Sequence, residues 1–447
     1  MTSEIKQRIE QINNGQVPEG YKETEFGIFP CDWVTDKTFG DLFSFNGGLG
    51  KSREELSENG IEYLHYGDMH RSDFNIASLE QYSKLPKYDT KIKGDESFLM
   101  QDGDVAFLDA SEDLEGTSRS VLIDNPENKP FIAGLHIIYG RPRGKELSKY
   151  YKQYLTRPEY IKKQFKKLAS GFKVYGLNRN TITGIKCAYP KFTAEQEKIA
   201  EILMKWDEAI VLYDRQIEKL KRLKLVCIKK MFPKKRSKVP EVRFKGFTKD
   251  WEQRKLGDIG KARSGVGFPD ADQGGVTGVP FFKVSDMNLD GNENEMIVAN
   301  NYVTAEQIAD HRWSPITELP AIFFAKVGAA VMLNRKRLCR FPFLLDNNTM
   351  AYSLTPTKWD ADFAKALFGT VDLTSLVQVG ALPSYNAGDV ESMGIYLPSL
   401  FEQEQIGAFF KLLDNLITLH QRKVEKIKTQ RKALQQYLLN GIVRVEV

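Results

Sequence analysis

Two stretches of the chain carry apolar side chains at alternating steps of four and three residues. Each position of the first stretch lies 207 residues before its counterpart in the second. This spacing draws one apolar stripe along a helix and is the heptad pattern of a coiled coil. It predicts two matching long helices, at residues 191–231 and 399–440. The stripes consist of Trp206, Ile210, Tyr213, Ile217, Leu220, Lys224, Cys227 and Met231, and of Leu413, Ile417, His420, Val424, Ile427, Arg431, Leu434 and Leu438.

The two predicted helices begin alike. Pro190 and Pro398 suit helix entrances, and the glutamates that follow place negative charge near the positive end of the helix dipole. Each helix would run for about 37 residues, or about 55 Å. A lone helix of that length leaves its apolar stripe in water, so we expect the two to pack as an antiparallel pair. The expected packing residues are Trp206, Ile210, Tyr213, Ile217, Leu220, Leu413, Ile417, His420, Val424 and Ile427.

Two cations interrupt the stripes at equivalent positions, Lys224 and Arg431. A long side chain that snorkels to solvent is the favoured interpretation, and a salt bridge that fixes the register of the pair is the alternative. Gly407 interrupts the second stretch near its start, where we expect a small bend.

Several short motifs occur twice along the chain, in the same order. An Asp-Trp pair at residue 32 recurs at residue 250, and the runs IEYLHYGDM and VPFFKVSDM are likewise 218 residues apart. YPKFTAEQEKIA answers LPSLFEQEQIGA at the helix entrances. Residues 70–170 and 288–378, by contrast, share almost no alignable stretch. Neutral drift would make the helices diverge as much as these central segments. We therefore interpret the repeat as a shared scaffold that carries two different variable domains.

The middles mix short apolar runs with a helical tail, which predicts an α+β domain in each half. The expected fold class is α+β, with two α/β-mixed variable domains separated by two long antiparallel coiled-coil helices in a pseudo-two-fold repeat. The expected strands include residues 62–65, 105–108, 131–139, 281–284 and 322–324, and the helical tails are 145–170 and 360–377. The expected division is an N-terminal helix and lead-in at 1–25, a variable domain at 26–190, the first long helix at 191–231, a linker at 232–243, a second variable domain at 244–398, the second long helix at 399–440 and a tail at 441–447.

Composition narrows the class of protein without deciding its role. Hydrophobic residues make up 41% and charged residues 28% of the 447 residues, as in an ordinary soluble, folded protein. A net charge of +5 permits nucleic-acid binding without demanding it, because phosphate contacts depend on local patches. No segment has the apolar length of a membrane span, and the start is not a secretory signal. We expect a cytoplasmic protein with no membrane contact.

Motifs for catalysis are missing from the sequence. The four cysteines form no C-x-x-C pair and the five histidines are scattered, so we predict no metal site. There is no Asn/Asp-Pro-Pro-aromatic motif for amino-methyl transfer, no G-x-G-x-x-G and no P-loop. GGLGKS at residues 47–52 lacks P-loop spacing, and the carboxylates at 111–115 favour a surface turn over a magnesium site. We therefore predict no catalytic residues.

Recognition of DNA in its grooves requires cations for phosphates and polar or planar side chains for base edges. Polar and basic loops in both variable domains supply them, although a solvated loop is the simpler alternative for any single residue. The basic linker at 232–244 is interpreted as solvated. The candidate DNA-binding residues are Asn46, Lys51, Ser52, Arg71, Lys173, Tyr175, Asn178, Arg179, Lys261, Arg263, Asn334, Arg335, Lys336 and Arg337.

Taken together, these features resemble the specificity subunits of type I restriction–modification enzymes. The resemblance covers nearly the whole chain. It rests on the P-x(3-4)-EQ-x-x-I helix entrances, the domain openings FGIFPCDW and GFTKDW, and the run SGVGFP…GGVTGVPFFKVSDM. DASED and AGLHI in the first half, and FAKVGAAVMLNRKRL and DNN in the second, add to it. The order and duplication of these phrases make the match specific.

The resemblance implies a sequence-specific DNA-binding subunit that is not itself an enzyme. Each variable domain would be a target-recognition domain for one half of a bipartite site in double-stranded DNA, and the helices would set the unread spacer. Two methyltransferase subunits would dock near the helices and bind S-adenosylmethionine, and restriction/motor subunits would use ATP and Mg²⁺. This chain would bind none of these cofactors. The alternatives are a stand-alone DNA-binding adaptor or coiled-coil scaffold and, less favoured because no catalytic motif is present, a fused restriction enzyme.

Overall fold

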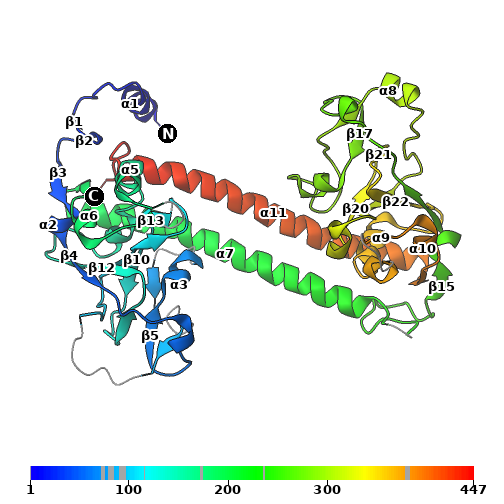
Figure 1. Ribbon diagram of the computed structural model, residues 1–447, viewed down its shortest axis with the longest axis horizontal. Helices are drawn as coiled ribbons and strands as arrows, with labels where there is room; N and C mark the ends of the chain where they lie inside the picture. Colours follow the sequence, from blue (N-terminus) through cyan, green and yellow to red (C-terminus); the bar gives the residue numbers. More distant parts are fainter. Residues whose placement is uncertain are drawn as a thin grey trace. The chain divides into compact units, whose positions relative to one another are not determined.

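The computed structural model describes residues 2–71, 76–78, 85–89, 97–114, 116–171, 175–234, 237–377 and 383–446, with the backbone alone at 70–71 and 76–78. The chain divides into two compact units, residues 1–212 with 424–447 and residues 213–423. Two long helices, α7 (Thr193–Met231) and α11 (Leu400–Leu439), each begin in one unit and end in the other (Figure 1). In the part of the chain that the structure describes, no helix has both the length and the hydropathy of a membrane span.

The first unit combines short strands with short helices. Its strands are β1 (Tyr21–Thr24), β2 (Gly27–Pro30), β3 (Trp33–Thr38), β4 (Phe43–Gly47), β5 (Ile61–Leu64), β6 (Ile76–Ser78), β7 (Lys87–Tyr88), β8 (Val105–Leu108), β9 (Ala110–Ser111), β10 (Ser120–Asp124), β11 (Phe131–Ala133), β12 (Ile137–Pro142), β13 (Tyr175–Gly176) and β14 (Lys186–Pro190). Its helices are α1 (Ser3–Asn13), α2 (Phe39–Leu42), α3 (Tyr66–Arg71), α5 (Glu159–Leu168) and α6 (Arg179–Thr183), with 3₁₀ turns η1 (Arg53–Glu55), η2 (Gly116–Ser118) and η3 (Tyr150–Tyr154). The strands form a sheet of order β4-β12-β8-β10-β6, a sheet of order β11-β5-β7 and three two-stranded pairs, β1-β2, β3-β14 and β9-β13.

The second unit is built from the same kinds of element. Its strands are β15 (Glu252–Lys255), β16 (Gly260–Ser264), β17 (Val279–Phe282), β18 (Tyr302–Val303), β19 (Ala321–Ala325), β20 (Lys336–Cys339), β21 (Leu344–Leu345), β22 (Thr349–Leu354) and β23 (Gly394–Leu397). Its short helices are α8 (Ala305–Asp310), α9 (Ala361–Phe368) and α10 (Ala387–Glu391), with 3₁₀ turns η4 (Leu256–Asp258), η5 (Asp270–Asp272), η6 (Val284–Asn288), η7 (Ala329–Leu333) and η8 (Leu373–Leu376). The sheets have the orders β15-β23, β16-β22-β19-β20 and β18-β17-β21.

The two units repeat one topology although their middle sequences do not align. The order β4-β12-β8-β10 corresponds to β16-β22-β19-β20, and β11-β5-β7 corresponds to β21-β17-β18. In both three-stranded sheets the first of these pairings is parallel and the second antiparallel. The two units therefore share one pattern of strand pairing although their side chains differ. The predicted α+β fold class, with its repeat and its two long helices, is confirmed.

One half of the antiparallel helix pair lies in each unit. In the first unit, the start of α7 and the end of α11 share one core, which includes Leu203 and Leu438. In the second unit, the end of α7 and the start of α11 share another, which includes Met231 and Phe410. The predicted packing residues are all buried or half-buried: Trp206, Ile210, Tyr213, Ile217, Leu220, Leu413, Ile417, His420, Val424 and Ile427.

The two cations that interrupt the stripes are paired, so the interpretation that they snorkel to solvent was wrong. Arg431 binds Asp207 at 2.9 Å in the first unit, and Lys224 binds Asp414 at 2.5 Å in the second. The two aspartates are also 207 residues apart, so the same ion pair occurs in both units. Lys365 adds a second cation to Asp414, at 2.7 Å. The aspartates are not members of the apolar stripes, and the stripe pattern alone therefore does not reveal them.

The glutamates at the helix entrances are buried anchors for the opposite end of the helix pair. Glu402, at the start of α11, accepts two bonds from Arg243, which follows α7, at 2.6 and 2.7 Å. Glu195, at the start of α7, accepts two bonds from Arg444, which follows α11, at 2.7 and 2.9 Å. The glutamine beside each glutamate donates to the carbonyl oxygen of the entrance proline, at 2.8 and 3.1 Å. The shared Glu-Gln motif thus ties the chain that follows one long helix to the entrance of the other.

The run at residues 131–139, predicted as one strand, is two. β11 ends at Ala133 and β12 begins at Ile137, and they belong to different sheets. Gly134, between them, passes so close to Tyr63 that a Cβ there would lie 2.3 Å from the ring. The predicted helical tail at 145–170 is also interrupted: it contains η3 and α5, with Pro158 as the cap before α5. An apolar run does not show where the chain changes sheets.

Close approaches explain the glycine of α11 and the glycines of two Gly-Asp steps that occur at residues 40 and 257 in the two halves. A Cβ on Gly40 would lie 3.0 Å from Thr183 of α6, and a Cβ on Gly257 would lie 3.1 Å from Glu391 of α10. α11 continues as one helix through Gly407, where a Cβ would lie 2.7 Å from the backbone nitrogen at the start of α9. These glycines allow a short helix to lie directly on its neighbour.

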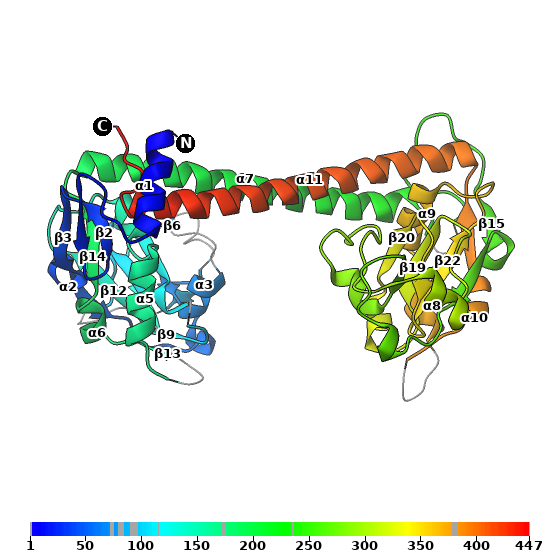
Figure 2. The ribbon, with the colours of Figure 1, turned by 90° about the horizontal axis from the view of Figure 1, so that it is seen from above.

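The described residues at both chain ends lie within the first unit (Figure 2). Tyr21 donates its hydroxyl to the carbonyl oxygen of Gly441 at 2.6 Å, and Arg8 donates to that of Ile442 at 2.9 Å. The C-terminal tail is therefore held by the N-terminal lead-in.

Candidate nucleic-acid interface

The Gly-rich loop of the first unit contains three candidate residues. Asn46 lies half-buried within β4. Lys51 binds Glu55 at 2.8 Å and lies over the ring of Tyr88, and the amide of Ser52 donates to the same carboxylate at 2.9 Å. The hydrogen bond from Lys51 lowers the pKa of Glu55 to about 2. These contacts close the loop on itself.

Two candidates have no described side chain. Arg71, which follows the Asp-Met motif of the first half, ends α3 and is described by its backbone alone, whereas Lys173, before the first long helix, lies outside the described residues. Tyr175 lies half-buried in β13, and Arg179 is exposed at the first position of α6. Among the described candidates of this segment, Arg179 is the cation that is open to a ligand.

Asn178 caps a helix. Its Oδ1 accepts the amide of Thr181 at 3.0 Å at the start of α6. Asn386 accepts the amide of Asp389 at 3.0 Å at the start of α10 in the second unit. Because the same cap occurs in both units, it accounts for Asn178 through the fold alone.

The second unit places Lys261 and Arg263 two residues apart on β16, an edge strand of its sheet. Lys261 is exposed. Arg263 donates to the carbonyl oxygen of Ser314 at 2.9 Å and lies 3.5 Å from Glu318. Lys261 is therefore open to a ligand, while Arg263 braces the loop before β19.

The basic cluster of the second unit is largely turned inward. Lys336 donates to Asn334 Oδ1 at 2.7 Å, and burial lowers the pKa of its ammonium to about 8. Arg337 donates to the carbonyl oxygen of Asn292 at 2.6 Å, and burial also lowers the pKa of its guanidinium. Exposed Arg335 donates to Asn288 at 2.7 Å. The structure brings Asn334, Arg335, Lys336 and Arg337 together in the wall of one cavity of about 240 Å³.

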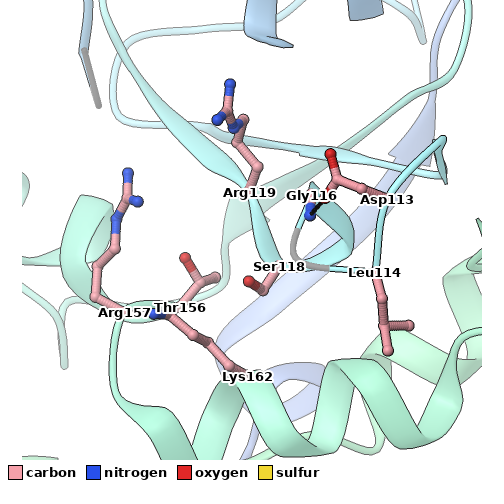
Figure 3. Close-up of a pocket in the computed structure, with 8 residues that line it drawn as sticks. All are labelled: Asp113, Leu114, Gly116, Ser118, Arg119, Thr156, Arg157 and Lys162. Carbon is pink, nitrogen blue, oxygen red and sulfur yellow. Dashed lines mark hydrogen bonds between the residues drawn. The ribbon is translucent and has the colours of Figure 1, made fainter. Parts of the chain in front are cut away.

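A pocket that the sequence did not predict lies beside α5 in the first unit (Figure 3). We call it the arginine pocket. It has a volume of about 440 Å³, and its described lining residues include three cationic side chains and one carboxylate. In Figure 3 the side chains of Arg119 and Arg157 both extend away from α5. The lining residues are Asp113, Leu114, Gly116, Ser118, Arg119, Thr156, Arg157 and Lys162.

Arg157 is the unusual member of this pocket. Its Nε is buried and has no hydrogen-bond partner among the described residues. Burial, together with the charges of Arg431 and Arg119, lowers the pKa of its guanidinium to about 10, so it remains protonated at neutral pH. In the sequence, Arg157 stands before a lysine-rich amphipathic helix and is indistinguishable from a solvated cation.

Metal chemistry finds no support in the described part of the chain. No group of three or more His, Cys, Asp or Glu side chains is placed to hold a metal ion there. The cysteines are all free thiols, and Cys187 and Cys339 are buried.

Comparison with known proteins identifies the family. The sequence matches the type I restriction modification DNA specificity domain at residues 30–222 and again at residues 248–429. The chain belongs to this family. Each copy of the specificity domain covers one set of sheets and much of the long helix that follows it. The resemblance seen in the helix entrances and domain openings is thereby confirmed.

Relatives of this specificity-domain protein match along most of its length. The type I restriction enzyme MjaVIII specificity subunit of Methanocaldococcus jannaschii is 25% identical, over 96% of this chain and 97% of the relative. The S subunit of a type I restriction–modification system from M. genitalium superposes with a TM-score of 0.57 at 15% identity, over 91% of this chain and 96% of that chain. A structure described as showing complex assembly and conformational transition of the type I R-M system gives 0.54 at 13% identity, over 96% and 100%. The two solved structures share the fold.

Proposed function

We propose that this chain is the DNA specificity subunit of a type I restriction–modification complex. Each α+β domain recognises one half of a bipartite site in double-stranded DNA, and the paired helices set the unread spacer between the halves. The observation that carries this proposal is the repeated frame with unlike loops. A common scaffold positions each domain on the DNA backbone, while different loops meet different base edges.

The partners in this proposal supply the chemistry. Two methyltransferase subunits bind S-adenosylmethionine, flip an adenine from each half-site and methylate it. Restriction/motor subunits bind ATP and Mg²⁺ and cut unmethylated DNA. The specificity subunit contributes recognition and distance, works in the cytoplasm, and binds none of these cofactors itself.

Exposed apolar side chains on the long helices support docking there. Leu412 and Leu419 lie seven residues apart on one face of α11 and are 58% and 61% exposed. Leu212, at the position of α7 equivalent to Leu419, is 55% exposed. Leucines on the outer face of a helix pair are suited to a protein partner.

Domain exchange tests the assignment of one half-site to each domain. Residues 26–190 are replaced by the corresponding segment of another specificity subunit, and methylated sites are mapped by sequencing the DNA of a methylation-free host. We expect one half of the methylated site to change while the other half and the spacer remain. Alteration of both halves would contradict the proposal.

A second experiment separates recognition from catalysis. The purified chain, alone or with the methyltransferase subunits, is incubated with DNA and labelled S-adenosylmethionine. We expect methyl transfer only in the reconstituted complex. Transfer by the lone chain would instead identify a fused enzyme, and failure to assemble with any methyltransferase would favour a stand-alone adaptor.

A further inference from the structure

The arginine pocket carries a surplus of positive charge. Its described lining residues include three cations, Arg119, Arg157 and Lys162, and one carboxylate, Asp113. That carboxylate accepts the amide of Gly116 at 2.5 Å, which closes the turn into η2. Lys162 binds Glu159 on the outer surface at 3.0 Å. The two arginines therefore dominate the electrostatic character of the pocket.

Among the described residues, the buried Nε of Arg157 has no hydrogen-bond partner. The carboxylate whose charge favours its protonation is Asp207, which already accepts from Arg431 at 3.0 Å and from the hydroxyl of Tyr154 at 3.1 Å. Arg119 and Arg431 both oppose its charge. A buried polar atom without a partner is costly, and no described residue supplies a partner for Arg157 Nε, so the arrangement favours an anion from outside the chain.

Further cations extend from the pocket along α5. Lys163 and Lys167 are exposed, one turn apart on the helix. Lys166 lies one turn beyond Lys162, on the side that lines the pocket. The buried side chains of Ile161 and Phe165 fix the opposite face of α5 on the core. A row of cations leading away from a cationic pocket suits a polyanion better than one isolated carboxylate.

We propose that the arginine pocket binds a phosphate of the DNA backbone, with Arg157 and Arg119 as its ligands and the α5 lysines along the neighbouring phosphates. This inference rests on the proposed function and adds a named contact to it. Guanidinium groups bind phosphate oxygens through paired, charge-assisted hydrogen bonds. A backbone contact of this kind positions the first domain on the duplex without reading its sequence.

The main test removes one charge at a time from the full chain, assembled with its methyltransferase subunits. Arg157→Gln and Arg119→Gln are compared with Lys6→Gln, which removes an exposed cation of the same unit, on α1. Dissociation constants are measured over a range of salt concentrations, on a duplex with the methylated site and on an unrelated duplex. Arg157→Lys, which retains the charge, completes the set.

We expect Arg157→Gln to weaken binding to both duplexes by the same factor, about tenfold. The slope of log K against log salt is expected to decrease by about 0.9, as for one lost phosphate contact. Arg157→Lys retains the slope, and Lys6→Gln changes neither quantity. Because removing an unpaired buried cation relieves desolvation and repulsion, Arg157→Gln is expected to melt no lower than the wild type, so weaker binding does not reflect unfolding.

Four results would overturn the proposal. Unchanged affinity and slope would mean that no phosphate binds in the pocket. A changed base preference would make Arg157 a base contact. Loss of methyltransferase assembly with intact DNA binding would assign the pocket to a carboxylate of the partner protein. Inorganic phosphate, added at constant ionic strength, tests whether the pocket binds a free ion instead of DNA. If phosphate raises the Tm of the full chain while Arg157→Gln leaves DNA binding unchanged, the proposal is also contradicted.

The unrelated duplex distinguishes this inference from the proposed function. Phosphates occur on every duplex, so the slope on unrelated DNA tests the pocket even if the wild type shows no site preference. A wild-type complex with no preference would contradict the specificity role alone.

Discussion

The buried carboxylate of Glu402 binds two other side chains at the start of α11. It is 1% exposed, accepts two bonds from Arg243 and accepts the indole N–H of Trp251 at 3.3 Å. Its counterpart Glu195 binds the more exposed Arg444, whose pKa is raised by that bond. The same motif therefore carries a more deeply buried ion pair in the second unit than in the first.

Neutralising this carboxylate is expected to destabilise the second unit. Glu402→Gln leaves the Arg243 guanidinium in a protected site without a counter-charge, which costs about 3 kcal/mol. Glu404→Gln, an exposed change two residues away, is the matched control and is expected to cost less than about 0.5 kcal/mol. Urea denaturation measures both. Equal effects would mean that the buried pair adds nothing to stability.

At the scale of elements, α11 and α9 meet at Gly407. A Cβ there would lie 2.2 Å from the carboxylate of Asp360, which caps α9, and 2.7 Å from the backbone nitrogen of Phe363. The equivalent position of α7 is Ala200, which is buried without such an obstacle. The glycine is therefore explained by the close approach of α9.

Gly407→Ala is expected to reverse the usual sign of a helix substitution. Alanine in place of glycine normally stabilises a helix interior by about 1 kcal/mol, but here the added methyl group displaces the start of α9. We expect a loss of about 1–3 kcal/mol, typical of overpacking, measured by thermal or urea denaturation. A more stable variant would show that α9 can shift without cost.

The repeated ion pair between α7 and α11 is a second feature of this scale. Asp207 with Arg431, and Asp414 with Lys224, hold the two helices in one antiparallel register within their units. A slip by one turn would separate each charge from its partner, so the pairs favour a single register.

A double-mutant cycle with Asp207→Asn and Arg431→Gln measures this pair. We expect a coupling energy of about 1 kcal/mol, because Arg431 is 14% exposed. The exposed pair of Glu425 and Lys428 on the same helix is the control, with an expected coupling below about 0.5 kcal/mol. Equal coupling energies in the two cycles would mean that the pair of Asp207 and Arg431 does not fix the register of the helices.

At the scale of the molecule, both long helices pass from one unit into the other. In the proposed function, their length is the distance between the two half-sites. Seven residues inserted into each helix, after residues 212 and 423, would add about 10.5 Å and keep the heptad phase.

This insertion is expected to lengthen the unread spacer by about three base pairs, at about 3.4 Å per pair. Methylome sequencing of a host that carries the variant provides the measurement. Insertion into α7 alone is the control and is expected to abolish methylation, because the repeated ion pairs can no longer form together. A functional variant with an unchanged spacer would separate helix length from half-site distance.

Much of this architecture is written locally along the chain. The entrance prolines and the heptad stripes together predict α7 and α11 to within two residues at each end, because proline placement and the helical period are visible in nearby residues. The repeated Asp-Trp pairs, the runs that end in Asp-Met and the Glu-Gln helix entrances point to the duplicated scaffold and the family. Polar loops were harder to interpret. An asparagine that caps a helix, such as Asn178, cannot be distinguished in the sequence from an asparagine that binds a base edge.

Contacts between residues distant in the sequence determined the remaining features of the structure. Arg431 and Lys224 bind carboxylates on the opposite helix, whereas Arg157, just as basic in sequence, has a buried Nε with no partner in the described part of the chain. The apolar run at 131–139 divides between two sheets because Gly134 packs on Tyr63. Periodicity is a property of neighbouring residues, but burial and charge pairing arise only when remote segments are brought together. Long helices could therefore be predicted from the chain alone, and the arginine pocket could not.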